Sequence, residues 1–72
     1  MRLRIRYLRE QKEFPQWAIA RFLHVSRTTY CRYENGELKI PLNSLFLLAD
    51  FYGTSVDYLI GKTDEKKPYP KY

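Results

Sequence analysis

Apolar residues recur at three- and four-residue spacing over most of the chain, which is typical of amphipathic helices. Breaks in this spacing divide the chain into five short segments, and no segment shows the alternation of a strand. The pattern predicts helices over about residues 3–12, 16–23, 26–34, 41–52 and 55–60. The side chains expected to face inward are Leu3, Ile5, Leu8, the stem of Lys12, Ile19, Ala20, Leu23, Tyr30, Tyr33, Leu42, Leu45, Leu48, Ala49, Tyr52, Val56, Leu59 and Ile60.

Start and stop signals support these segments. Pro15 and Pro41 suit the first position of a helix, where the missing N–H is not needed. Ser26 and Ser55 are good N-cap residues for the third and fifth helices. Each of the last three helices is followed by a glycine that can adopt a left-handed conformation, namely Gly36, Gly53 and Gly61. Helices joined by so few residues predict one all-α domain over residues 1–61.

The remaining residues, 62–72, are charged, contain Pro68 and Pro70 and lack periodicity, so we expect a flexible or loosely docked tail. The one cysteine, Cys31, excludes an internal disulfide and fits a reducing compartment. With the single histidine, His24, it makes no convincing zinc site. The sequence shows no membrane span and no secretory signal, which indicates a cytoplasmic protein.

The net charge of +5 is unevenly distributed. Residues 1–36 hold eight Lys and Arg against three Glu, a balance of 8 − 3 = +5, whereas residues 37–72 hold five basic and five acidic side chains. This asymmetry predicts a first half that faces a polyanion and a neutral supporting half. The alternative interpretation is an ordinary basic surface in solvent.

Residues 16–36 have the pattern of a helix-turn-helix unit. Ala20 is small enough to let the two helices cross closely, and His24 is a residue type that tolerates a left-handed turn. Val25 then anchors the turn in the core. The second helix turns Arg27, Thr28, Thr29 and Arg32 outward.

This outward set suits the reading of bases in duplex DNA. Arginine bonds O6 and N7 of guanine, and threonine bonds a base or contacts the thymine methyl. The N-terminal end of such a helix also favours phosphate. A polar face in solvent is the alternative, because every amphipathic helix has one.

Beyond this local pattern, residues 5–61 resemble the phage-repressor-like transcription regulators of the Xre or Cro/C1 family. The resemblance is collinear over about four-fifths of the chain. The matching stretches are Ile5–Lys12, Val25–Arg27, Arg32–Gly36, Ile40–Leu42 and Leu48–Gly61. It implies a compact five-helix, lambda-repressor-like DNA-binding domain with the helix-turn-helix at about residues 16–35. It also implies a bacterial or phage-encoded regulator, a repressor in our interpretation, that binds a two-fold operator as a homodimer. We expect the fifth helix and the tail to form the dimer interface.

The resemblance also implies roles for individual side chains. Base contacts are expected from Arg27, Thr28, Arg32 and the neighbouring Cys31. Phosphate contacts are expected from Gln16, Ser26, Thr29, Asn35 and Lys39. Gln16 would also brace the recognition helix. Arg9 and Glu34 match an internal ion pair between the first and third helices, with direct phosphate contact as the alternative for Arg9.

Four positions depart from the commonest family pattern. Glu13 and His24 stand where glycine is usual, so both turns are expected to be strained. Pro15 replaces the usual Ser or Thr cap. Trp17 occupies a position that is usually charged, and partial burial against a neighbouring helix is favoured over stacking on the DNA backbone or contact with a protein.

Other functions were weighed against DNA binding. A protein-interaction module, such as an antitoxin or a regulator that binds another protein, would use Trp17, Phe22, Tyr69 and Tyr72. An enzyme is not expected, because no nucleophile–base pair, carboxylate pair or phosphate-binding loop is present. No cofactor, metal or small-molecule site is evident. RNA binding is less favoured, since no exposed sheet carries stacking aromatic residues.

Overall fold

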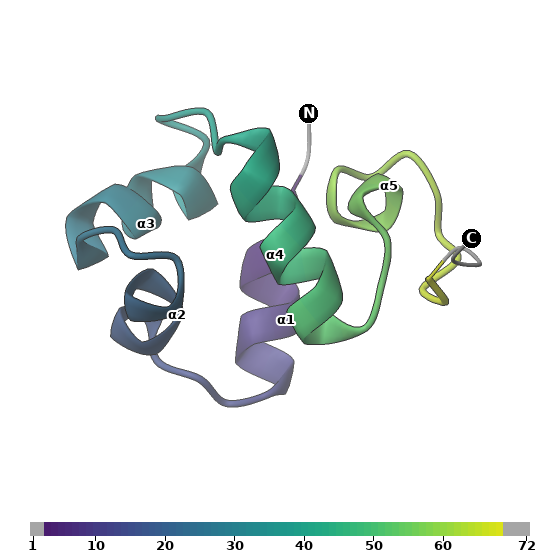
Figure 1. Ribbon diagram of the computed structural model, residues 1–72, viewed down its shortest axis with the longest axis horizontal. Helices are drawn as coiled ribbons and strands as arrows, with labels where there is room; N and C mark the ends of the chain where they lie inside the picture. Colours follow the sequence, from purple (N-terminus) through teal and green to yellow (C-terminus); the bar gives the residue numbers. More distant parts are fainter. Residues whose placement is uncertain (1–2, 69–72) are drawn as a thin grey trace.

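The computed structural model describes residues 3–68, and these residues form five helices and no strand. The helices are α1 (Ile5–Gln11), α2 (Gln16–Phe22), α3 (Arg27–Asn35), α4 (Leu42–Tyr52) and α5 (Val56–Leu59). In Figure 1, α4 crosses in front of α1, α2 and α3 lie on one side of this pair, and α5 lies on the other. The predicted all-α, five-helix architecture is confirmed.

One apolar core joins all five helices. Its fully buried side chains come from α1, α2, α3, α4 and α5: Ile5, Leu8, Ile19, Tyr30, Leu48 and Leu59. The periodicity therefore identified the inward faces correctly in most places.

Two predicted inward residues are wrong. Leu42 is 60% exposed, and Lys12 is exposed after the last turn of α1. Ile40 lies in the loop between α3 and α4, as expected, but it is 8% exposed and packs in the core. Because the chain between α3 and α4 turns Ile40 inward, Leu42 is left at the outer edge of α4.

The helix ends explain the turns. Each helix is closed by a residue with positive φ and by a pair of reversed backbone hydrogen bonds, the Schellman arrangement. Gly36, Gly53 and Gly61 take this position after α3, α4 and α5. Glu13 and His24, each at φ 60°, take it after α1 and α2. The predicted strain at both turns therefore has a backbone basis, since a Cβ is disfavoured there.

The helix boundaries shift slightly from the sequence-based ranges. α1 is shorter than predicted because Lys12 and Glu13 already form its closing turn. α3 extends through Asn35, and only Gly36 leaves the helical conformation. Ser26 and Ser55 cap α3 and α5, and Pro15 offers α2 no side-chain cap.

The described part of the predicted tail contacts the domain. The guanidinium of Arg4 donates to the carbonyl oxygens of Tyr58, at 3.1 Å, and Thr63, at 2.6 Å. It also pairs with Asp64 and lies 4.3 Å from the ring centre of Tyr58. Thr54 donates to the carbonyl oxygen of Lys66 at 2.6 Å. Residues 62–68 are called the C-terminal strap below.

Within residues 3–68, no helix has the length and apolar character needed to cross a bilayer.

Candidate nucleic-acid interface

The α2–α3 pair is held together by small and aromatic residues at its crossing. Ala20 of α2 is 2% exposed, and Tyr30 and Tyr33 of α3 are 0% and 5% exposed. The two tyrosine rings meet edge to face, with their centres 6.5 Å apart. Burial of these residues fixes the inner side of α3 and leaves its outer side free.

The outer side of α3 carries the predicted base-reading set. Arg27, Thr28 and Arg32 are exposed, whereas Cys31 is half-buried. The Asn35 amide nitrogen lies 3.5 Å from the Cys31 sulfur, one turn along the same helix. The geometry thus brings two guanidinium groups and a hydroxyl to one surface.

The first turn of α3 is ordered by Ser26. The Ser26 hydroxyl oxygen accepts from the backbone N–H of Thr29 at 3.1 Å, and the hydroxyl donates to Thr29 Oγ1 at 2.9 Å. Ser26 is exposed and Thr29 is half-buried. The Ser26 side chain therefore caps the start of α3.

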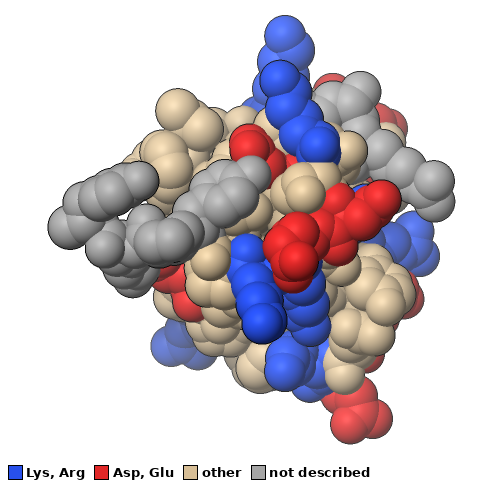
Figure 2. Space-filling model, turned by 90° about the vertical axis from the view of Figure 1, so that its right-hand side faces the viewer, with Lys and Arg blue, Asp and Glu red and all other residues tan. Residues whose placement is uncertain are grey.

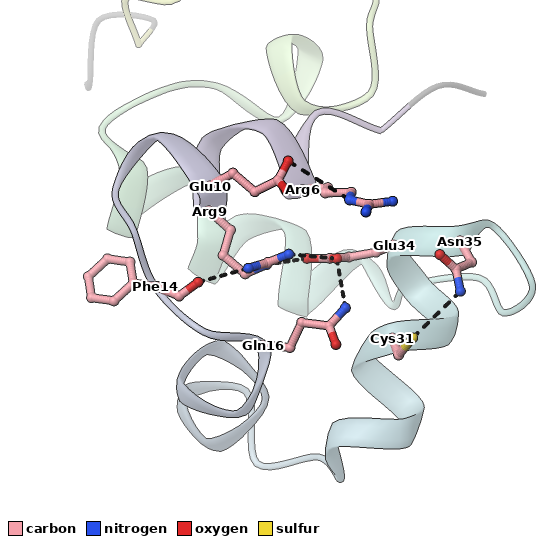
Figure 3. Close-up of polar contacts among 8 residues, drawn as sticks. All are labelled: Arg6, Arg9, Glu10, Phe14, Gln16, Cys31, Glu34 and Asn35. Carbon is pink, nitrogen blue, oxygen red and sulfur yellow. Dashed lines mark hydrogen bonds and ion pairs between the residues drawn. The ribbon is translucent and has the colours of Figure 1, made fainter.

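A polar brace fixes the other end of α3 (Figure 3). Arg9 Nε lies 2.7 Å from one carboxylate oxygen of Glu34, and Arg9 Nη2 lies 3.2 Å from the other. Gln16 donates from its amide to Glu34 at 3.0 Å, and Arg9 donates to the Phe14 carbonyl oxygen at 2.8 Å. One carboxylate thus ties α3 to α1 and to the start of α2.

The brace is deeply buried: the Glu34 side chain is 1% exposed and the Arg9 side chain 11%. Burial alone would raise the pKa of Glu34, but hydrogen bonds from Arg9 and Gln16 outweigh it, so the pKa lies below its usual value. The hydrogen bond to Glu34 raises the pKa of Arg9 in turn. Both groups stay charged at neutral pH.

Two buried hydroxyls lie beside this brace. Within the described residues, neither the Tyr30 nor the Tyr52 hydroxyl has a partner in hydrogen-bonding geometry, although Tyr30 faces the Glu34 carboxylate. Burial raises the pKa of both, that of Tyr52 to about 12. Helical periodicity identified both tyrosines only as core residues, so it could not predict that their hydroxyls are unpaired.

The remaining predicted contacts lie around the brace. The expected Arg9–Glu34 ion pair is present, and the Gln16 amide nitrogen is engaged with Glu34, as a bracing role requires. Asn35, the last residue of α3, and Lys39, in the loop that follows, are both exposed. Their phosphate contacts, and that of Gln16, stay predictions.

Trp17 follows Gln16 in the first turn of α2. It is 56% exposed, so its burial against neighbouring helices is limited. Phe22 is 39% exposed and packs on Phe51 with ring centres 4.9 Å apart. Of the four aromatic residues considered for protein contact, Tyr69 and Tyr72 lie outside the described residues, and Trp17 is more open to solvent than Phe22.

In residues 3–68, no three His, Cys, Asp or Glu side chains come together as a metal site.

Comparison with known proteins places this geometry in a family. A family model described as helix-turn-helix matches residues 5–59. The chain is 35% identical over 65 residues to the uncharacterized HTH-type transcriptional regulator YobD of Bacillus subtilis strain 168, covering 90% of this chain and 58% of that protein. It is 32% identical over 68 residues to the HTH-type transcriptional regulator AnsR of the same strain, covering 94% and 59%.

The chain therefore spans a little under three-fifths of the length of these relatives. No solved structure matches significantly. The family match covers both helices of the helix-turn-helix, the Arg9–Glu34 brace and the core beneath them. The chain belongs to the helix-turn-helix family of Xre and Cro/C1-type regulators.

Proposed function

We propose that this chain binds duplex DNA sequence-specifically and regulates transcription, with α3 lying in the major groove. The observation that carries the proposal is the division of α3 into two sides. Tyr30, Tyr33 and Glu34 hold its inner side, while Arg27, Thr28 and Arg32 project from its outer side. A fixed helix with free guanidinium groups matches the requirements of direct base readout.

The polar side chains at the two ends of α3 are suited to binding DNA phosphates. Ser26 and Thr29 lie at its N-terminal end, where N–H groups and the helix dipole favour an anion. Asn35 ends α3, and Lys39 lies in the loop that follows. Phosphate contacts at both ends would fix the register of the helix, and base contacts between them would supply specificity.

We further propose a homodimer on DNA. One recognition helix reads only a few base pairs, so a two-fold operator with half-sites about one helical turn apart would supply the necessary specificity. We propose repression as the mode of regulation, because a dimer bound over an operator blocks access of other proteins to that DNA.

Selection of bound duplexes from a random library tests the main proposal. We expect a recurring half-site, repeated in inverted orientation. Arg27→Ala and Arg32→Ala should each weaken binding to that site by about 1–3 kcal/mol and relax base preference at one position. The matched control is Arg21→Ala, because Arg21 is an exposed arginine of α2 rather than α3.

Equal losses on all sequences would show that these arginines contact only phosphates. Failure to enrich any duplex at low salt, together with recovery of a stoichiometric protein partner, would instead support a protein-interaction module.

A further inference from the structure

The hydroxyl of Tyr30 is a buried donor without a partner. The Tyr30 side chain is 0% exposed, and within the described residues its hydroxyl makes no hydrogen bond. A buried hydroxyl of this kind lowers stability, because it has lost its bonds to water and gained none in the fold. Its presence in the core therefore calls for an explanation.

The group that this hydroxyl faces is the Glu34 carboxylate. Tyr30 and Glu34 are four residues apart on α3, so their side chains lie on the same side of the helix. Glu34 Oε1 already accepts from Gln16, at 3.0 Å, and from Arg9, at 3.2 Å. A carboxylate oxygen has two lone pairs, so both positions on Oε1 are occupied. The Tyr30 hydroxyl thus lies beside a carboxylate with one oxygen fully engaged.

Gln16 is the partner of Glu34 that can leave. Figure 3 shows Arg9 and Gln16 reaching the carboxylate from α1 and from the start of α2. Arg9 bonds to both carboxylate oxygens, whereas Gln16 bonds to one of them. The Arg9 side chain is 11% exposed, and Gln16 is half-buried. The Gln16 amide is therefore both the weaker and the more accessible of the two partners.

Duplex DNA would compete for this amide. Gln16 begins α2, which lies with α3 on one side of the α1–α4 pair (Figure 1). The face around α5 shows acidic and basic side chains intermingled, an arrangement that does not favour a polyanion (Figure 2). One amide nitrogen shared by Glu34 and a phosphate would hold two anions about 5 Å apart, and like charges at that separation repel each other. A phosphate at Gln16 therefore favours release of the Glu34 carboxylate.

We propose that Glu34 exchanges partners when the chain binds DNA. The Gln16 amide turns to a phosphate, and the Tyr30 hydroxyl takes its place on the carboxylate. Arg9 holds the carboxylate throughout, so α3 keeps its position while Gln16 becomes free for DNA. Tyr30 is then a positioning residue that does not itself contact DNA. This inference rests on the proposed function and deepens it, since it supplies the donor that replaces Gln16 on Glu34.

Thermal unfolding without DNA tests the exchange directly. In the wild-type background, Tyr30→Phe removes an unpaired hydroxyl, so the midpoint of unfolding should stay the same or rise. Gln16→Ala frees one position on Glu34 Oε1, and the Tyr30 hydroxyl should then bond to the carboxylate. In that background, Tyr30→Phe should lower the midpoint by about 4–8 °C, as for one hydrogen bond in a domain of this size.

Binding to the duplex selected from the random library tests the same exchange on DNA. Tyr30→Phe should raise the dissociation constant about tenfold, because Gln16 then leaves Glu34 without a substitute donor. In the Gln16→Ala background, Tyr30→Phe should change the constant by less than about twofold, since no exchange takes place. Tyr52→Phe is the matched control and should leave the constant unchanged. Its hydroxyl is also buried and unpaired within the described residues, but it lies on α4.

A lower midpoint for Tyr30→Phe in the wild-type background, or an unchanged midpoint in the Gln16→Ala background, would overturn the exchange. Equal losses of affinity in the two backgrounds, or no loss in either, would overturn it as well. Loss of duplex binding by every chain, the wild type included, would contradict the proposed function instead. The unfolding midpoints would still decide whether Tyr30 replaces Gln16 on Glu34.

Discussion

Glu34 joins α3 to the first two helices through a single carboxylate. It receives hydrogen bonds from Arg9 of α1 and Gln16 of α2, and its side chain is 1% exposed. Removing one partner from a buried ion pair leaves the other charge uncompensated. The position of α3 therefore depends on the ionisation of Glu34.

This dependence predicts acid sensitivity. The pKa of Glu34 in the folded chain lies below its usual value of 4.5. Folding therefore favours the ionised carboxylate over the protonated carboxyl group. The resulting stability is fully present above pH 4.5 and is lost as the pH falls through the folded-state pKa. We expect the free energy of unfolding, measured by urea titration at several pH values, to decrease over this window.

Two variants show whether Glu34 is responsible. Glu34→Gln should be less stable than the wild type at neutral pH, and its free energy of unfolding should fall less as the pH is lowered. Glu37→Gln, in the exposed α3–α4 loop, should keep the pH dependence of the wild type. If Glu34→Gln lost as much stability at acid pH as the wild type does, other carboxylates would be responsible for the acid sensitivity.

Glu13 and His24 offer a second test at the residue scale. Both have φ of 60° in turns where the other three helices use glycine. We expect Glu13→Gly and His24→Gly each to raise the free energy of unfolding by about 0.5–1 kcal/mol. Glycine relieves the strain of the left-handed backbone in the folded state, and this gain in free energy exceeds the cost of the larger conformational entropy that glycine gives the unfolded chain. Thermal unfolding measures the change.

Gly53→Ala provides the reverse experiment. Its φ is 67°, and a Cβ added there meets no atom within 4 Å, so only the backbone conformation resists the substitution. It should lower stability by about 1 kcal/mol. A stabilising alanine at this position, or a destabilising glycine at His24, would contradict the account of these turns.

Among the elements, the C-terminal strap is the least expected. Arg4 donates to the carbonyl oxygens of Tyr58 and Thr63 and lies over the Tyr58 ring. Its contact with Asp64 adds little, because the Asp64 side chain is 97% exposed. The bonds to the backbone therefore account for most of the attachment.

Arg4→Met should release the strap while retaining the aliphatic stem of the side chain. We expect faster amide hydrogen exchange in residues 62–68 and a loss of stability on the order of 1–2 kcal/mol, as for hydrogen bonds from a charged group. Arg6→Met, with its exposed side chain on α1, is the control. Equal exchange rates in the two variants would show that Arg4 does not hold the strap.

These elements also show how far the sequence predicts the structure. Periodicity and capping signals predicted the five helices, because each depends on neighbours within about four residues. Periodicity also assigned Leu42 to the core, and this assignment is wrong. The loop before α4 buries Ile40 instead, and the spacing of apolar residues within a helix contains no information about that loop. Arg4 and its partners in residues 58–64 are separated by more than 50 positions, and no local pattern predicts such a contact.

The site divides in the same way. The outward side of α3 follows from helical geometry, and the family resemblance supplied the Arg9–Glu34 pair. The bond from Arg9 to the Phe14 carbonyl and the unpaired hydroxyls of Tyr30 and Tyr52 depend on side-chain packing in three dimensions. Sequence patterns describe which side of a helix is buried, but not which polar atoms meet there.

At the scale of the whole molecule, the excess positive charge lies in the first half of the chain. The basic first half contains α2 and α3, and the neutral second half contains α4 and α5. If DNA contacts the basic half, the affinity of the chain for duplex DNA must fall steeply as the salt concentration rises, because each neutralised phosphate releases counterions. The slope of log K against log salt counts those contacts.

Lys39 provides the sharpest test of this count, because it lies beyond the first half yet is exposed close to the end of α3. Lys39→Ala should reduce the slope by about 0.9 and weaken binding to all duplexes alike, as loss of one phosphate contact requires. Lys62→Ala removes an equal charge from the strap and should leave the slope unchanged. If both variants reduced the slope equally, the overall charge of the chain, rather than a phosphate contact at Lys39, would govern the salt dependence.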